Sequence, residues 1–139
     1  MTNIHDQAAR SFRIYLAEGQ ALFPDARPSH LCLRTATPEE YAVFHMASKL
    51  IGTVRERSHG GRPITWVSLD EPIVHDQAHL KWLEITHPKP DDAYATGPQM
   101  LVFHDESLED PVKHLSLADP AFAFRCQRIS AAQLANRLG

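Results

Sequence analysis

Two adjacent glycines, Gly60 and Gly61, constrain the fold more than any other feature of this chain of 139 residues. They separate two segments in which polar and apolar residues alternate, "VRERSH" at 54–59 and "RPITWVSL" at 62–69. Alternation with a period of two is typical of strands, and a two-glycine connection supplies the positive φ angles of a tight hairpin turn. The sequence therefore predicts an antiparallel hairpin, and "HLKWLEIT" at about 79–86 predicts a third strand after it.

The clearest helix signal precedes this hairpin, at residues 38–51. Thr37 occupies the N-cap position, Pro38 the first turn, and Glu40 completes a capping box, while Gly52 ends the segment. Its predicted apolar stripe consists of Val43, Phe44, Ala47, Leu50 and Ile51.

A short strand, "HLCLRT" at 30–35, comes before this helix and places His30, Cys32 and Arg34 on one face. Residues 30–86 therefore predict a β-α-β-β-β unit, with the helix on the outer face of a curled, mixed, four-stranded sheet.

The flanking segments predict one helix before this unit and a shorter second unit after it. A helix is expected at about 5–20, where Ala8, Phe12 and Leu16 recur at helical spacing. The second unit is predicted as a strand at 99–104, a weak short helix at 107–117 and a strand at 121–129. A closing helix follows, with Ser130 as N-cap and Gln133 in the capping-box position. Three strands do not fit after the second helix, so the second unit is abbreviated.

Length and composition favour a single α+β domain over residues 1–139, since 43% of the residues are hydrophobic. We expect an N-terminal helix and linker at 1–25, a first module at 26–90 and an abbreviated second module at 97–139. The formal charge is −3, and no basic run carries interleaved aromatic residues, so no nucleic-acid partner is expected. The chain has no apolar run of about 20 residues, and its first residues are too polar for a secretory signal, so we expect a soluble cytoplasmic protein.

Glu84 poses the main chemical question of the sequence. On a strand at 79–86 its carboxylate lies in line with Leu80 and Trp82. Burying an ionised carboxylate costs several kcal/mol unless a cation or hydrogen-bond donors meet it. Glu84 therefore needs a partner, an open cleft or a bound proton, and Arg34 could supply a charge-assisted, bidentate pair.

Three segments, "SHLCLR" (29–34), "GGRPITWVSLDEPI" (60–73) and "WLEITHPKP" (82–90), carry a resemblance to a known family. In this order and at these separations they resemble the YecM family of small bacterial proteins. This family belongs to the vicinal oxygen chelate superfamily, which includes glyoxalase, bleomycin-resistance and extradiol-dioxygenase proteins. The resemblance covers about residues 26–105. It implies β-α-β-β-β modules of glyoxalase type whose curled sheet forms a cup, with a divalent metal held by side chains of the first and last strands of the modules.

The resemblance places His30 and Glu84 at metal-ligand positions, with Glu84 also as the catalytic carboxylate. Histidine and carboxylate suit Zn²⁺, Mn²⁺, Fe²⁺ or Ni²⁺, and a metal with an open position polarises the oxygen atoms of a substrate. The next histidine of the family pattern is replaced here by Met100, whose thioether is a poor ligand for hard cations. His104, on the same strand face, could substitute as a ligand, although a position in solvent at the end of the strand is favoured. His30 could also be a neutral histidine hydrogen-bonded inside the sheet.

Two functions remain open at this point. One is a small-molecule-binding cup that has lost its metal, in which Arg34, Trp66, Trp82 and Met100 contact the ligand. The other is a metal-dependent lyase, isomerase or dioxygenase that acts on a small oxygenated substrate, with Arg34 orienting an anionic group. Met100 favours the first function and predicts little stabilisation by added metal. An abbreviated second half also leaves sheet edge and apolar surface uncovered, so a homodimer is expected.

Two other motifs predict no chemistry. The "HDQAH" segment (75–79) has the histidine spacing of a zinc-binding helix, but it follows Pro72 and leads directly into a strand, so a polar loop is expected. The sequence contains no G-x-S-x-G elbow, so a nucleophilic hydrolase has no support.

Overall fold

The computed structural model describes residues 3–89, 95–105, 114–116 and 124–138. Its elements, in chain order, are α1 (Ile4–Leu22), β1 (Arg27–Arg34), α2 (Pro38–Ser48), β2 (Gly52–His59), β3 (Arg62–His75), β4 (Ala78–Thr86), β5 (Gly97–Asp105), β6 (His114–Ser116), β7 (Arg125–Ser130) and α3 (Ala131–Leu138). None of the helices in the described part of the chain has the length and apolar character that crossing a membrane requires.

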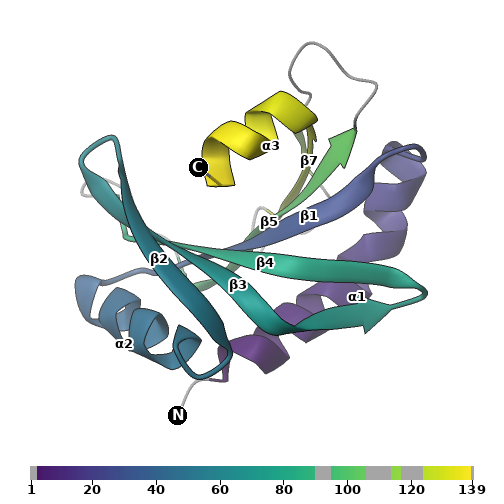
Figure 1. The fold of residues 1–139 in the computed structure, drawn as a ribbon. Helices are drawn as coiled ribbons and strands as arrows, with labels where there is room; N and C mark the ends of the chain where they lie inside the picture. Colours follow the sequence, from purple (N-terminus) through teal and green to yellow (C-terminus); the bar gives the residue numbers. More distant parts are fainter. Residues whose placement is uncertain (1–2, 90–94, 106–113, 117–123, 139) are drawn as a thin grey trace.

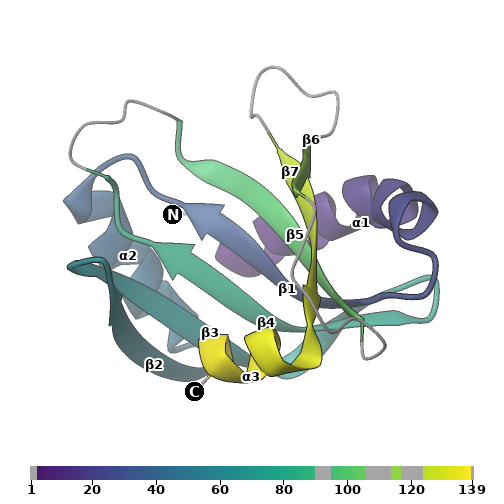
Figure 2. The same ribbon diagram turned by 90° about the horizontal axis from the view of Figure 1, so that it is seen from above.

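One mixed sheet of seven strands, in the order β2-β3-β4-β1-β5-β7-β6, organises the fold. β1 pairs in parallel with β4, and β5 pairs in parallel with β7, whereas the other pairings are antiparallel. The sheet curls so that α1 and α2 lie against its outer side, while α3 lies over its concave side (Figures 1 and 2). The α+β class and the β-α-β-β-β order of residues 30–86 are confirmed.

The two faces of the sheet carry separate apolar clusters. The larger cluster lies between the sheet and the outer helices and includes Phe12 of α1 and Phe44 of α2, together with Leu31 and Leu33 of β1. The smaller cluster contains Cys32, Val102 and Ile129, with Met100 and Leu134 packed against it. Because strand residues alternate between faces, odd positions of β1 fill the outer core and its even positions face the cup.

Two tight turns fix the register of the central strands. Gly60 and Gly61 join β2 to β3 with φ angles of 59° and 79°, as the two-glycine hairpin predicts. Asp76 and Gln77 join β3 to β4, also at positive φ, so the "HDQAH" segment is a strand connection rather than a zinc-binding helix. The pairing of β3 with β4 is irregular between Ser68 and Ile73. Beyond this irregularity Leu80 joins the outer core with Leu83, so its predicted alignment with Trp82 and Glu84 is wrong.

The predicted packing face of α2 is wrong in part: Phe44, Ala47 and Ile51 pack on the outer core as expected, but two other residues do not. Val43 and Leu50 are 52% and 82% exposed, whereas Tyr41, Phe44 and Ser48 are buried. Tyr41 and Ser48 are polar, but they can be buried because their hydroxyl groups form hydrogen bonds; the Ser48 hydroxyl, for example, donates to the carbonyl of Phe44 at 3.0 Å. The helix ends at Ser48 rather than at residue 51, and 49–51 form a turn before β2.

In the C-terminal half, the structure agrees with the sequence-based prediction at both ends but not in the middle. Most of the helix predicted at 107–117 lies outside the described residues, but its last part is β6, which pairs with β7. The helix prediction is wrong for this part because ladder hydrogen bonds override a weak helical pattern. The capping box of α3 is confirmed, since Ser130 Oγ accepts from the backbone N–H of Gln133 at 3.1 Å and Gln133 Oε1 accepts from that of Ser130 at 3.2 Å.

Candidate metal and ligand site

Three potential metal ligands meet on the concave face of the sheet. His30 and Cys32 lie two residues apart on β1, so their side chains point to the same face. Glu84 lies on the neighbouring parallel strand β4, at the position that pairs with Cys32. One potential ligand atom from each of the three residues lies within 4.8 Å of the other two. The parallel crossover through α2 therefore brings together residues that are some fifty positions apart in the sequence.

His30 is fully buried and presents one free ring nitrogen. Its Nδ1 lies 2.8 Å from the hydroxyl of Ser29, whereas Nε2 is buried with no hydrogen-bond partner among the described residues. Burial, together with the smaller effects of the charges of Arg137 and His104, lowers the pKa of His30 to about 3, so the ring is neutral. Its edge packs on Trp66, with ring centroids 4.9 Å apart. A neutral imidazole whose Nδ1 is held by a hydroxyl can offer Nε2 to a metal.

Cys32 and Glu84 interact directly. The Cys32 thiol donates a hydrogen bond to the Glu84 carboxylate; burial, the Glu84 charge and this bond all raise the pKa of the thiol. Burial also raises the pKa of Glu84, an effect that the hydrogen bond from Cys32 and the charges of Arg137, His59 and Arg62 only partly offset. The carboxylate is therefore less solvated than an ordinary surface glutamate and holds its proton more tightly.

The donor set of this cluster fits a divalent transition metal. Imidazole nitrogen, thiolate and carboxylate oxygen are the three ligand types of protein zinc sites, and three protein ligands leave a position for water or substrate. A neutral histidine, a thiolate and a carboxylate also balance the charge of a divalent ion. The unpartnered Nε2 of His30 supports the fit, because buried polar atoms normally have a hydrogen-bond partner. The sequence placed Cys32 on the same strand face as His30 and predicted its lone thiol to be a small core residue. Its place in the ligand cluster became visible only when the register of β1 and β4 was known.

A cleft of about 630 Å³ opens next to this cluster. It is lined by Glu84 and by Arg34, Trp66 and Met100, which the sequence predicted as ligand-binding residues. Trp82 lies elsewhere: it lines a second cleft of about 690 Å³, together with His104. The structure therefore places most of the predicted site residues in one cleft, but Trp82 lies in another.

The sequence prediction missed most of the basic residues of the cleft, Arg57, Arg62, Arg125 and Arg137. They come from β2, β3, β7 and α3. Arg34, which the sequence offered as one possible partner for Glu84, donates from Nε to the carbonyl of Ala95 at 3.0 Å. Among the basic groups whose charges lower the pKa of Glu84 are Arg137, His59 and Arg62.

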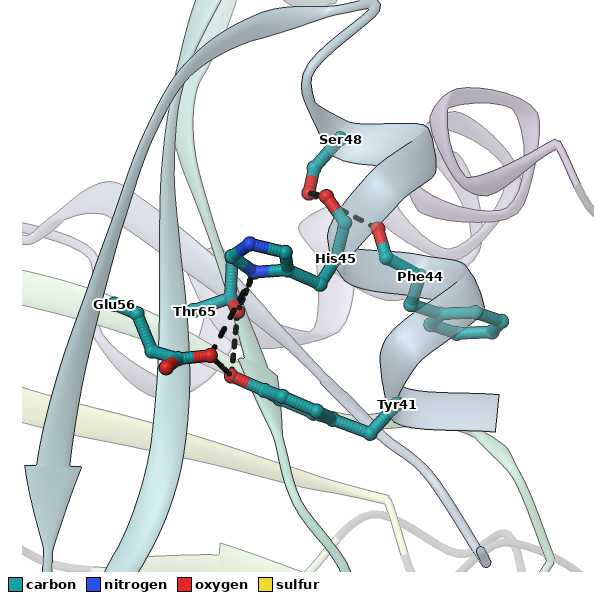
Figure 3. Close-up of polar contacts among 6 residues, drawn as sticks. All are labelled: Tyr41, Phe44, His45, Ser48, Glu56 and Thr65. Atoms are coloured by element: carbon teal, nitrogen blue, oxygen red, sulfur yellow. Dashed lines mark hydrogen bonds and ion pairs between the residues drawn. The ribbon is translucent and has the colours of Figure 1, made fainter. Parts of the chain in front are cut away.

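A second polar cluster lies on the outer side of the sheet, where α2 packs on β2 and β3 (Figure 3). The Tyr41 hydroxyl donates to the Glu56 carboxylate at 2.8 Å and lies 2.6 Å from Thr65 Oγ1, which in turn lies 2.8 Å from Nδ1 of His45. Thr65 is fully buried, so its hydroxyl has no access to a substrate. These hydrogen bonds connect α2 to the sheet.

Comparison with solved structures supports the fold over the whole chain. A structure described as "Structural Genomics, Protein EC4020" matches with a TM-score of 0.68 and 16% identity, over 100% of this chain and 98% of that one. At this identity the likeness shows the fold alone. The sequence itself matched no model of a known protein family, and no curated protein matched it.

Two structures of methylmalonyl-CoA epimerase also match this chain. A Streptomyces coelicolor variant in complex with 2-nitronate-propionyl-CoA has a TM-score of 0.48 and 11% identity, over 76% of this chain and 97% of that one. An epimerase in complex with methylmalonyl-CoA and NH4+ also has a TM-score of 0.48 and 11% identity, over 78% of this chain and 96% of that one.

Proposed function

We propose that this protein is a small-molecule-binding cup of the vicinal oxygen chelate type, and that His30, Cys32 and Glu84 bind a divalent metal ion at its floor. The observation that carries this proposal is the Nε2 of His30, which is buried without a hydrogen-bond partner among the described residues. His30 also belongs to the cluster in which one potential ligand atom from each residue lies within 4.8 Å of the other two. A buried imidazole nitrogen left unpaired costs free energy, and a metal ion would satisfy it.

Cys32 weakens the argument against metal binding that Met100 suggested. With His30 and Glu84 alone, two ligands rarely hold an ion, and a methionine in place of a third ligand argues against metal. A third ligand on β1 removes that objection, and its thiolate makes the set softer. Such a set favours Zn²⁺ over Mn²⁺. Met100 packs against the cluster that contains Cys32, and a thioether is compatible with these softer surroundings.

The chain's own residues divide the work of binding. His30, Cys32 and Glu84 would hold the ion, and a bound ion would act as a Lewis acid toward oxygen atoms of a ligand. Trp66 forms an apolar wall of the cleft and keeps His30 in place by edge-to-face packing. α3 lies on the concave side and contributes Asn136 and Arg137 to the lining of the cleft.

A metal-dependent lyase, isomerase or dioxygenase is the second candidate function. The favouring observation is that Glu84 belongs both to the ligand cluster and to the lining of the cleft. A substrate in the cleft would therefore lie next to the ion, and Glu84 is the carboxylate available to accept a proton from it. Support for the enzyme requires measured turnover of a substrate, whereas support for the binding cup requires only binding of metal and ligand.

Metal content and thermal unfolding test the proposal. Protein purified without an affinity tag is analysed for metals, then depleted with a chelator, dialysed and titrated with Zn²⁺, Mn²⁺ or Ni²⁺. Since a ligand that binds only the folded state stabilises it, Zn²⁺ at a hundred times its Kd should add about 2.7 kcal/mol. His30→Ala, Cys32→Ser and Glu84→Gln should each abolish the rise in Tm.

Cys126→Ser is the matched control, because Cys126 is also a buried free cysteine but belongs to the outer core. It should lower the Tm of the metal-free protein and leave the Zn²⁺-induced rise intact. A folded wild type whose Tm does not respond to any of these ions would instead support a cup without metal.

A further inference from the structure

The charge of the cleft differs sharply from that of the chain. The whole protein has 14 Lys and Arg against 17 Asp and Glu. The cleft, in contrast, has a single carboxylate in its described lining, Glu84, and six basic side chains: Arg34, Arg57, Arg62, Lys89, Arg125 and Arg137. A low-dielectric hollow lined by charges of one sign focuses its field and attracts ions of the opposite sign.

These basic groups converge from distant parts of the sequence. Arg57 and Arg62 flank the β2–β3 turn, Arg125 begins β7, and Arg137 lies on α3, which crosses the concave side of the sheet (Figure 2). The backbone carbonyl of Arg137 accepts a hydrogen bond from Arg57 at 3.4 Å, so the end of α3 is tied to β2. The fold thus places positive charge on several sides of the same hollow.

The hydrogen bonds that hold these arginines do not neutralise their charge. Arg62 donates to the carbonyl of His87 at 2.8 Å, and Arg137 donates to Oε1 of Gln127 at 3.1 Å. These acceptors are neutral, as is the carbonyl bound by Arg57. No salt bridge within the described ranges includes Arg57, Arg62, Arg125 or Arg137. The guanidinium groups are therefore positioned by neutral acceptors, and their charge is available to a ligand.

We propose that the ligand of this cup is a small phosphorylated molecule whose phosphate is bound by the arginines of the cleft, chiefly Arg62, Arg125 and Arg137. This inference rests on the proposed function, since it names the ligand class of the same cleft. The planar guanidinium group matches phosphate oxygens in a bidentate geometry, and a phosphate ester carries more charge than a monocarboxylate. Arg62 and Arg137 act electrostatically on Glu84, so a phosphate there would lie at the end of the cleft nearest the ligand cluster.

The size of the cleft restricts the phosphorylated ligand to a small molecule. Its volume of about 630 Å³ falls among small-molecule sites, which span roughly 300–1,000 Å³. The basic residues line this hollow, whereas nucleic-acid-binding surfaces typically present a basic patch on one face or a basic stripe along a helix. Trp66 and Ile64 line the same cleft and supply apolar area for the remainder of the molecule.

Calorimetric titration of metal-depleted protein tests the proposal without relying on the ion, which pyrophosphate itself would chelate. The probes are inorganic phosphate, inorganic pyrophosphate and glycerol 3-phosphate, with succinate and glycerol for comparison. The two phosphate anions and the ester should bind, and succinate should bind more weakly. Loss of a charge-assisted hydrogen bond should weaken pyrophosphate binding about tenfold or more in Arg62→Gln and in Arg125→Gln.

Arg125→Gln is the easier of these two variants to interpret, because Arg125 is exposed and its replacement should disturb the fold less. Arg13→Gln, which removes the same charge from the exposed side of α1, is the control and should bind pyrophosphate like the wild type. Succinate binding at least as tightly as the phosphate probes would overturn the ligand class, and so would a folded wild type that binds none of them. If the protein binds Zn²⁺ but none of the phosphate probes, the metal proposal holds and the phosphate proposal fails. If it binds the phosphate probes but its Tm does not respond to metal, the phosphate proposal holds and the metal proposal fails.

Discussion

Cys32 and Glu84 occupy paired positions on the parallel strands β1 and β4, and the thiol of one hydrogen-bonds to the carboxylate of the other. A thiol is a weak donor, so this bond compensates poorly for a desolvated carboxylate. His30, whose Nε2 is buried without a hydrogen-bond partner among the described residues, belongs to the same cluster. Under the proposed function, one metal ion would satisfy all three groups.

Glu84→Gln should raise the thermal stability of the metal-free protein. Burial raises the pKa of Glu84, so its ionised form is unfavourable at neutral pH, and a neutral amide removes that cost. If Glu84 were instead one half of a structural ion pair, the same substitution would destabilise the fold by a few kcal/mol. The measurement is Tm at pH 7 after chelator treatment, with Gln99→Glu as a reverse control that adds a carboxylate to the same cleft. A lower Tm for Glu84→Gln would favour the ion-pair account.

Thr65→Val should destabilise the protein through the outer polar cluster. Thr65 Oγ1 bonds both the Tyr41 hydroxyl and Nδ1 of His45, and valine keeps the shape but removes both bonds (Figure 3). Leaving buried partners unsatisfied costs about 1–3 kcal/mol. Denaturant unfolding measures this loss, and Thr53→Val on the exposed surface of β2 should change stability by less than about 0.5 kcal/mol. Equal effects at both positions would contradict the assigned role of the cluster.

Tyr41 should make stability fall at alkaline pH. Burial and the Glu56 carboxylate raise the pKa of Tyr41 above its ordinary value of 10.0, so the folded state keeps the proton that the unfolded chain loses. Above pH 10 the unfolded chain therefore binds fewer protons than the folded one, and the free energy of unfolding decreases as pH rises. This contribution is fully present below pH 10. Urea unfolding from pH 9 to 12 should show a steeper decline for the wild type than for Tyr41→Phe, and parallel curves would refute this assignment.

A homodimer remains a prediction for this chain. β2 is an edge strand of the sheet, and the neighbouring helix α2 exposes Val43, Met46 and Leu50. Uncovered strand edges and apolar side chains are both surfaces on which a second copy can pack. Size-exclusion chromatography with light scattering should give twice the chain mass of 15.6 kDa. A single species of the chain mass at working concentration would exclude the dimer.

The sequence predicted the elements whose signals are local. The Gly60–Gly61 hairpin and the capping boxes at Thr37 and Ser130 depend on residues a few positions apart, and each formed as expected. Apolar spacing predicted only part of the packing face of α2, because buried Ser48 and Tyr41 are satisfied by hydrogen bonds that only the folded chain provides.

The site was predictable only in part, for the same reason. The resemblance placed His30 and Glu84 together, but the contact of Cys32 with Glu84 depends on the register between two strands separated by a helix and a hairpin. The convergence of Arg57 and Arg137 joins residues eighty positions apart. β6 likewise exists through its pairing with β7, which a weak local pattern did not reveal.

Cobalt substitution tests the central claim, that Cys32 binds a metal together with His30 and Glu84, most directly. Co²⁺ is added stepwise to metal-depleted protein, and the thiolate-to-cobalt charge-transfer absorption in the near ultraviolet is recorded. The account predicts that this band saturates at one ion per chain, disappears in Cys32→Ser, and persists in Cys126→Ser. A folded wild type without the band, or a band that survives in Cys32→Ser, would contradict it.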